Sequence, residues 1–202
     1  MRVKDLHKAF GALKVLRGVT LELPRGRTTV VLGPSGCGKS VMLKHLVGLE
    51  RPDRGEVWFG DQRIDQVRER DLAPLRRRIG FLFQQSALFD SLTVGENVAF
   101  PLVEHGLTTH GTADPRVARV LRMVGLEEKM RQMPADLSGG QRKRIALARA
   151  IVLDPEVVLY DEPTTGLDPI TSDVINELIL KLADELRSEE HTSELQSPCN
   201  LV

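Results

Sequence analysis

Residues 33–40 combine glycines, a lysine and a serine at the spacing of a phosphate-binding loop. They follow the pattern GxxxxGK[ST] and are Gly33, Pro34, Ser35, Gly36, Cys37, Gly38, Lys39 and Ser40. Glycines let backbone N–H groups curl around phosphate oxygens, and the N-terminus of a following helix adds its positive end. We expect Lys39 to reach the β and γ phosphates of a nucleotide and the Ser40 hydroxyl to bind Mg²⁺. The alternative is a glycine-rich turn with a surface lysine.

A second pair of chemically active residues follows the apolar run from Val157 to Tyr160. This run has the composition of a buried strand, which would deliver Asp161 and Glu162 to the carboxyl edge of a sheet. Asp161 is expected to hold Mg²⁺ through water, and Glu162 to polarise an attacking water. Alone, such a pair is more often a solvated loop; beside a phosphate loop in the same chain, a site for hydrolysis is the better interpretation.

A third motif, LSGGQ, begins at Leu137 and is followed by the run RKRIALARA. Its chemically active residues are Ser138, Gly139, Gly140 and Gln141. At the start of a helix they would offer N–H donors and a hydroxyl to a γ-phosphate. One chain therefore carries two phosphate-binding segments.

The motif LSGGQ resembles the signature motif of the ABC ATPases. The resemblance covers about residues 1–186. It implies a head-to-tail homodimer in which each signature loop closes the ATP of the other subunit, with integral membrane permease subunits as further partners. ATP and Mg²⁺ are the implied cofactors.

Three more positions match the family pattern. Phe10 resembles the aromatic residue that stacks on adenine, with an ordinary core phenylalanine as an equally good interpretation. Gln84 resembles the Q-loop glutamine that contacts Mg²⁺ and relays to the membrane subunit, although its neighbour Gln85 leaves the assignment open by one residue. Asp168 resembles the D-loop aspartate that communicates across the dimer.

The elements around these motifs predict an α/β fold, a P-loop NTPase core of the ABC ATPase type with an antiparallel β edge and a helical signature subdomain. A strand is expected over 28–32, buried on both faces, then a helix from Ser40 to Gly48. The other expected elements are a hairpin at 55–64, a strand at 79–83, mostly helices over about 85–155, a strand at 157–160 and a helix at 171–186.

Composition bounds the class of protein. The 202 residues carry 28 basic and 28 acidic side chains, which gives no field for nucleic-acid binding. We expect no signal peptide and no membrane span. We also expect no disulfide framework, since the only cysteines are Cys37 and Cys199. These features favour a cytoplasmic protein held to the membrane by its permease.

The cargo and the C-terminus are inferred from further resemblances. The stretch SALFDSLTVGENVAFPL resembles the ATPase of the Mla-type phospholipid transport system, which implies the bacterial inner membrane. Amino-acid and lipoprotein-release ATPases share most of these residues, so the cargo is inferred by analogy. Residues 187–202 are polar and resemble a translated sequencing adapter, so we expect a truncated chain in which His191 is not the switch histidine of the family. The alternatives are a soluble ABC clamp on nucleic acid or ribosomes, and a nucleotide-binding fragment without turnover.

Overall fold

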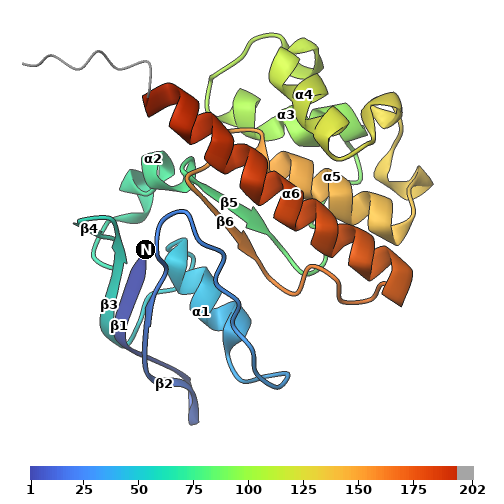
Figure 1. Ribbon diagram of the computed structural model, residues 1–202. Coiled ribbons are helices and arrows are strands. Elements are labelled where there is room, and N and C mark those ends of the chain that lie inside the picture. Colours follow the sequence, from blue (N-terminus) through green and yellow to red (C-terminus); the bar gives the residue numbers. More distant parts are fainter. Residues whose placement is uncertain (195–202) are drawn as a thin grey trace, which may run out of the picture. The chain divides into compact units, whose positions relative to one another are not determined.

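The computed structural model describes residues 1–194, with side chains to residue 185. The chain divides into two compact units, Met1–Ile79 and the part from Gly80 onward. Figure 1 labels their helices and strands. None of the helices within residues 1–194 has a stretch both long and apolar enough to traverse a bilayer.

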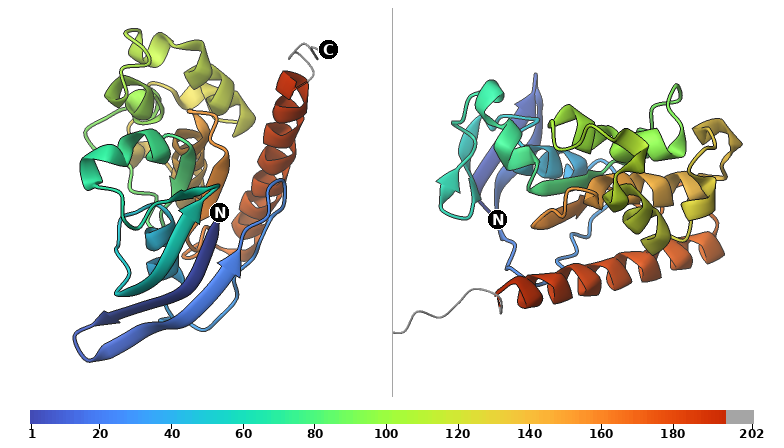
Figure 2. Two further views of the ribbon diagram at one scale, coloured as in Figure 1. Left: turned by 90° about the vertical axis from the view of Figure 1, so that its left-hand side faces the viewer. Right: turned by 90° about the horizontal axis from the view of Figure 1, so that it is seen from above.

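The first unit is built on an antiparallel sheet with the strand order β2-β1-β3-β4. Its strands are β1 (Arg2–Phe10), β2 (Leu13–Glu22), β3 (Arg54–Phe59) and β4 (Gln62–Arg63). Figure 2 shows β1, β2 and β3 side by side as one twisted layer. The register pairs Phe10 with Leu13 at the hairpin and Val3 with Val57 across β1 and β3. The expected hairpin at 55–64 is confirmed.

Helix α1 (Lys39–Leu46) packs against β3 in this unit and buries Met42 and Leu46. The helix expected from Ser40 is thereby confirmed. A 3₁₀ turn, η1 (Glu69–Asp71), and the short helix α2 (Ala73–Arg76) complete the unit.

The prediction of a strand over residues 28–32 is wrong. This segment has no regular structure, and Val30 and Leu32 are 72% and 89% exposed. A strand requires backbone hydrogen bonds to a neighbouring strand. Neither sheet of the described residues includes this segment, so its β-branched composition alone does not make it a strand.

The second unit contains a two-stranded sheet, β5 (Ile79–Leu82) with β6 (Val157–Tyr160), as expected. The Asp161 N–H donates to the Leu82 carbonyl at 3.0 Å, which joins the carboxyl ends of both strands and shows that they run parallel. The helices are α3 (Val94–Glu104), α4 (Pro115–Met123), α5 (Gly139–Ile151) and α6 (Pro169–Glu194). Three 3₁₀ turns lie between them, η2 (Gly111–Ala113), η3 (Glu127–Lys129) and η4 (Pro134–Asp136).

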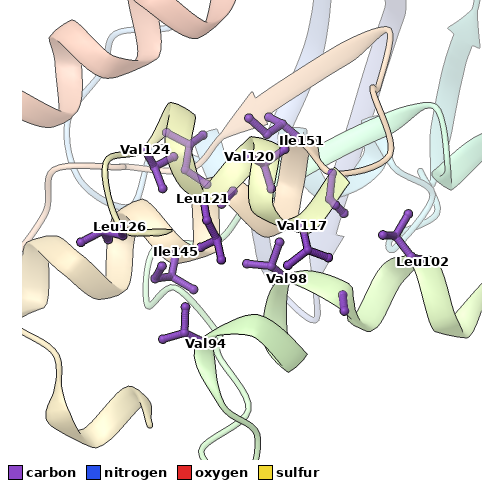
Figure 3. Packing of buried hydrophobic residues seen from close by; sticks show 14 of the residues in the cluster. Val94, Val98, Leu102, Val117, Val120, Leu121, Val124, Leu126, Ile145 and Ile151 are labelled. Atoms are coloured by element: carbon purple, nitrogen blue, oxygen red, sulfur yellow. The ribbon is translucent and has the colours of Figure 1, made fainter. Parts of the chain in front are cut away.

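Local sequence signals explain where these helices start. Thr93 and Glu96 form a reciprocal capping box at α3, and the Asp114 carboxylate caps α4, whose first residue is Pro115. The apolar faces of α3, α4 and α5 then meet in one core, in which Val98, Val120 and Ile145 are fully buried (Figure 3). This core fixes the helix α5 that carries the signature motif.

Helix α6 is longer than the sequence predicts. It continues past the expected end at Leu186 to Glu194, so His191 lies within it. The remaining residues of the expected polar tail, 195–202, lie outside the described part. The adapter origin of this segment stays a prediction.

Candidate functional site

The phosphate-loop residues lie at the start of α1. Gly38 precedes the helix with φ = 99°, and a Cβ there would lie 2.8 Å from the Val15 side chain, so only glycine fits without strain. The Lys39 ammonium donates to the carbonyl oxygens of Gly33 and Pro34 at 2.9 and 3.0 Å. Its charge therefore lies over the loop, as a phosphate-binding role requires.

Phe10 ends β1 and is 46% exposed, which disfavours the interpretation as a core residue. The Lys8 ammonium lies 5.4 Å from the centre of its ring. An exposed aromatic ring with a cation nearby is suited to stacking on a base.

Asp161 and Glu162 follow β6 in the second unit. Asp161 is buried, whereas Glu162 is half-buried and adopts φ = 46°, a left-handed conformation that costs free energy outside glycine. Burial of the neighbouring phenol raises the pKa of Tyr160 to about 12. The last residue of β6 therefore lies in an apolar environment, and the two carboxylates follow it directly in sequence.

The Glu162 carboxylate accepts two hydrogen bonds at one oxygen. The Gln84 amide nitrogen and the Thr165 hydroxyl each donate to Oε2 at 3.0 Å. Gln84 leaves β5 at the edge where β6 ends, which explains how residues far apart in sequence meet. Of the two neighbouring glutamines, Gln84 is the one whose side chain donates to Glu162.

Sequence reasoning missed two residues at this site, Thr165 and Lys143. Thr165 has a local signal, since it lies three residues after Glu162 and its N–H also donates to the Glu162 carbonyl at 3.2 Å. Lys143 has no local signal. Its buried ammonium donates to the Gln84 carbonyl from helix α5, 59 residues away in sequence.

The signature residues begin α5 as expected. The Ser138 hydroxyl accepts from the Gln141 N–H at 3.2 Å, and the Gln141 side chain accepts from the Ser138 N–H at 2.9 Å. This capping box leaves Ser138 exposed and fixes the direction of the first helical turn.

Gly140 lies beneath this exposed end. It is buried, and a Cβ there would lie 2.5 Å from the Thr171 Cγ2 atom of α6. The position therefore packs two helices together, and Ser138 and Gly139 are the more accessible part of the motif.

Asp168 caps α6 near the same place. Its carboxylate accepts from the Thr171 N–H at 3.0 Å and from the Thr171 hydroxyl at 2.6 Å. These hydrogen bonds stabilise the charged form and hold the pKa of Asp168 below its ordinary value. The side chain is thus an exposed carboxylate in one fixed orientation.

The described residues offer no dense cluster of metal-binding side chains. They contain no group of three or more histidine, cysteine and acidic side chains that could hold a metal. Mg²⁺ does not need such a group, since it binds through one or two carboxylates, water and substrate phosphates. Within the second unit, Asp161 and the Gln84 amide oxygen are oxygen donors of the kind that Mg²⁺ binds.

Comparison with known proteins defines the family. The profile of the family described as ABC transporter matches residues 16–165, and the chain belongs to this family. A dimeric ATP-binding cassette, MJ0796, in a post-hydrolysis state bound to ADP and Pi, superposes with a TM-score of 0.82 at 35% identity, covering 91% of this chain and 83% of the other. The fold is therefore the α/β fold of the ABC ATPases, as predicted.

Two curated relatives show the range of transporters involved. The probable ribonucleotide transport ATP-binding protein mkl of Mycobacterium leprae is 43% identical over 90% of this chain and 52% of its own length. The intermembrane phospholipid transport ATP-binding protein MlaF of Haemophilus influenzae is 40% identical over 92% of this chain and 70% of its own length. The chain spans about half the length of the first of these relatives.

Proposed function

We propose that the chain binds MgATP and hydrolyses it to drive an ABC transporter. Lys39 and the loop from Gly33 to Ser40 bind the phosphates, Phe10 stacks on adenine, and Asp161 holds Mg²⁺ with Ser40 and Gln84. Residues 1–186 form the nucleotide-binding domain, with its helical part at about 85–155.

The observation that carries this proposal is the pair of hydrogen bonds on Glu162 Oε2. A carboxylate held by Gln84 and Thr165 keeps its second oxygen oriented, and a general base needs this orientation to accept a proton from water. Glu162 is the catalytic residue in this proposal. Asp168 communicates across the dimer.

The exposed N-terminus of α5 supports a head-to-tail homodimer. The signature residues would bind the γ-phosphate of the ATP held by the other subunit; they are Ser138, Gly139, Gly140 and Gln141. Gly140 also packs α5 against α6. Phosphate release per subunit should therefore rise with protein concentration in the presence of MgATP. A rate per subunit independent of concentration, at concentrations where the protein is monomeric, contradicts the dimer.

For the cargo we propose phospholipid, with the subunit bound to its permease at the cytoplasmic face of the bacterial inner membrane. The support is the resemblance of residues 86–102 to the Mla-type ATPase and the similarity to MlaF. The test is reconstitution with the permease in liposomes, where phospholipid transfer should depend on ATP. Stimulation of hydrolysis by ribonucleotides, without lipid transfer, would reject this cargo.

A further inference from the structure

We propose that Lys143 is a positioning residue of the ATPase site: it holds the Gln84 carbonyl and thereby keeps the Gln84 side chain on Glu162. The inference rests on the proposed function of Glu162 as the catalytic base. Lys143 and Gln84 thereby connect helix α5, which begins at the signature motif, to the Glu162 carboxylate through two consecutive hydrogen bonds.

The burial of Lys143 is the first support. Lysine is almost never fully buried unless it is paired, yet Lys143 is 5% exposed. Its ammonium donates to the Gln84 carbonyl. A buried charge at this position costs free energy that an apolar residue would not, so packing alone does not explain it.

The charges around Lys143 are the second support. Burial lowers the pKa of Lys143, and the negative charges of Asp161 and Glu162 oppose this effect. Both carboxylates therefore act on the charge of the ammonium that donates to the Gln84 carbonyl. The other basic residues of α5 donate elsewhere: Arg142 to the Leu137 carbonyl, Arg144 to the Val124 carbonyl and Arg149 to the Ser86 carbonyl.

The conformation of the chain after Gln84 is the third support. Ser86 and Ala87 have φ values of 64° and 46°, a left-handed conformation that is unfavourable outside glycine and persists only when surrounding contacts impose it. Helix α5 supplies such contacts to two backbone carbonyls of this segment. Lys143 donates to the Gln84 carbonyl, and Arg149 donates to the Ser86 carbonyl at 2.8 Å. Without Lys143 the segment can relax and carry the Gln84 side chain away from Glu162.

The first experiment separates turnover from nucleotide binding in the full chain. Lys143→Met keeps most of the side-chain volume and removes the donor, and we expect kcat for ATP hydrolysis to fall about tenfold while KM changes less than twofold. Lys143→Gln supplies an amide donor and should restore most of kcat. The matched control is Arg144→Met, which removes another cation-to-carbonyl contact of α5 and should leave kcat within twofold.

A double-mutant cycle tests whether Lys143 acts through Gln84. In the Gln84→Ala background the backbone carbonyl remains but the side chain is gone, so Lys143→Met should lower kcat less than twofold further. A further tenfold loss in that background would mean that Lys143 acts independently of Gln84, and the proposal would be wrong.

A second readout does not depend on turnover. Amide hydrogen exchange over residues 83–88 should become faster in Lys143→Met and remain near the wild-type rate in Lys143→Gln and Arg144→Met. Unchanged exchange in Lys143→Met overturns the proposal, and Lys143→Leu replaces this variant if it does not fold. Absence of hydrolysis by the wild-type protein contradicts the proposed function, whereas normal kcat in a folded Lys143→Met protein contradicts only the role of Lys143.

Discussion

Gln84 and Glu162 lie 78 residues apart in sequence, and their side chains are joined by a hydrogen bond of 3.0 Å. This hydrogen bond joins the segments that follow the carboxyl ends of β5 and β6, the two parallel strands of the second unit. The residue that we propose as a ligand of Mg²⁺ therefore contacts the residue that we propose as the base that activates water. Four predictions test the roles of these and the other motif residues.

Glu162→Gln should keep MgATP binding and stop turnover. The amide retains the shape of the carboxylate but is not a base, and loss of a general base lowers rates by about 10²- to 10⁴-fold. Phosphate release and light scattering in MgATP should show an inactive protein trapped as a dimer. The control is Glu177→Gln, an exposed position on α6. Normal hydrolysis by Glu162→Gln would show that Glu162 is not catalytic.

Lys39→Ala should weaken MgATP binding by about 10- to 100-fold or more. A hydrogen bond to a charged group contributes roughly 1.5–3 kcal/mol, and Lys39 supplies such a bond within the phosphate loop. Titration calorimetry measures the affinity. Lys44→Ala, in the last turn of the same helix, should bind MgATP normally. Wild-type affinity in Lys39→Ala would reject the assignment of the loop.

Ser138 allows helix capping to be separated from phosphate binding. Ser138→Ala should lower Tm by roughly 2–4 °C, since loss of an N-cap costs about 1 kcal/mol. Ser138→Asp keeps a capping oxygen and should retain Tm, but its charge repels a γ-phosphate, so MgATP should no longer produce a dimer. Thr93→Asp makes the same change at the cap of α3 and should leave dimerisation intact. A normal MgATP dimer of Ser138→Asp would contradict the phosphate-binding role.

Replacing Phe89 with a charged residue should weaken association with the permease. Of the apolar residues after Gln84, Val94 and Val98 are fully buried core, Leu88 and Leu92 are half-buried, and Phe89 is 41% exposed. Aromatic residues central to an interface contribute about 2 kcal/mol or more, so Phe89→Asp should reduce permease binding by about 30-fold in a pull-down or titration, with MgATP binding unchanged.

The comparison for Phe89 is Leu180→Asp, another exposed apolar position, on α6. This variant should bind the permease normally. Phe89 also packs on Phe100, with ring centres 4.6 Å apart, so a combined loss of nucleotide and permease binding in Phe89→Asp would mean that its role is structural.

Local patterns predicted most of the fold, and long-range contacts explain the failures. The strand at 157–160 and the helix start at Ser138 are encoded by adjacent residues, and both are observed. The segment 28–32 has an equally strong local pattern, but a strand also requires a partner, and none of the described strands pairs with it. Sequence periodicity contains no information about that partner.

The same limit applies to the site. The P-loop, the carboxylate pair and LSGGQ are short motifs that can be recognised in sequence. Lys143 could not be, because its contact with Gln84 spans 59 residues and depends on how α5 packs beside β5. The choice between Gln84 and Gln85 likewise depends on the direction in which the chain leaves the sheet.

The close approach of Gly140 to Thr171 restricts how the protein can diverge. An alanine at position 140 would collide with the Thr171 Cγ2 methyl group at 2.5 Å. A serine at position 171 would remove this methyl group and retain the hydroxyl that donates to Asp168 at 2.6 Å. The two positions should therefore covary, because a larger residue at 140 becomes compatible with the packing of α5 on α6 only after 171 has become smaller.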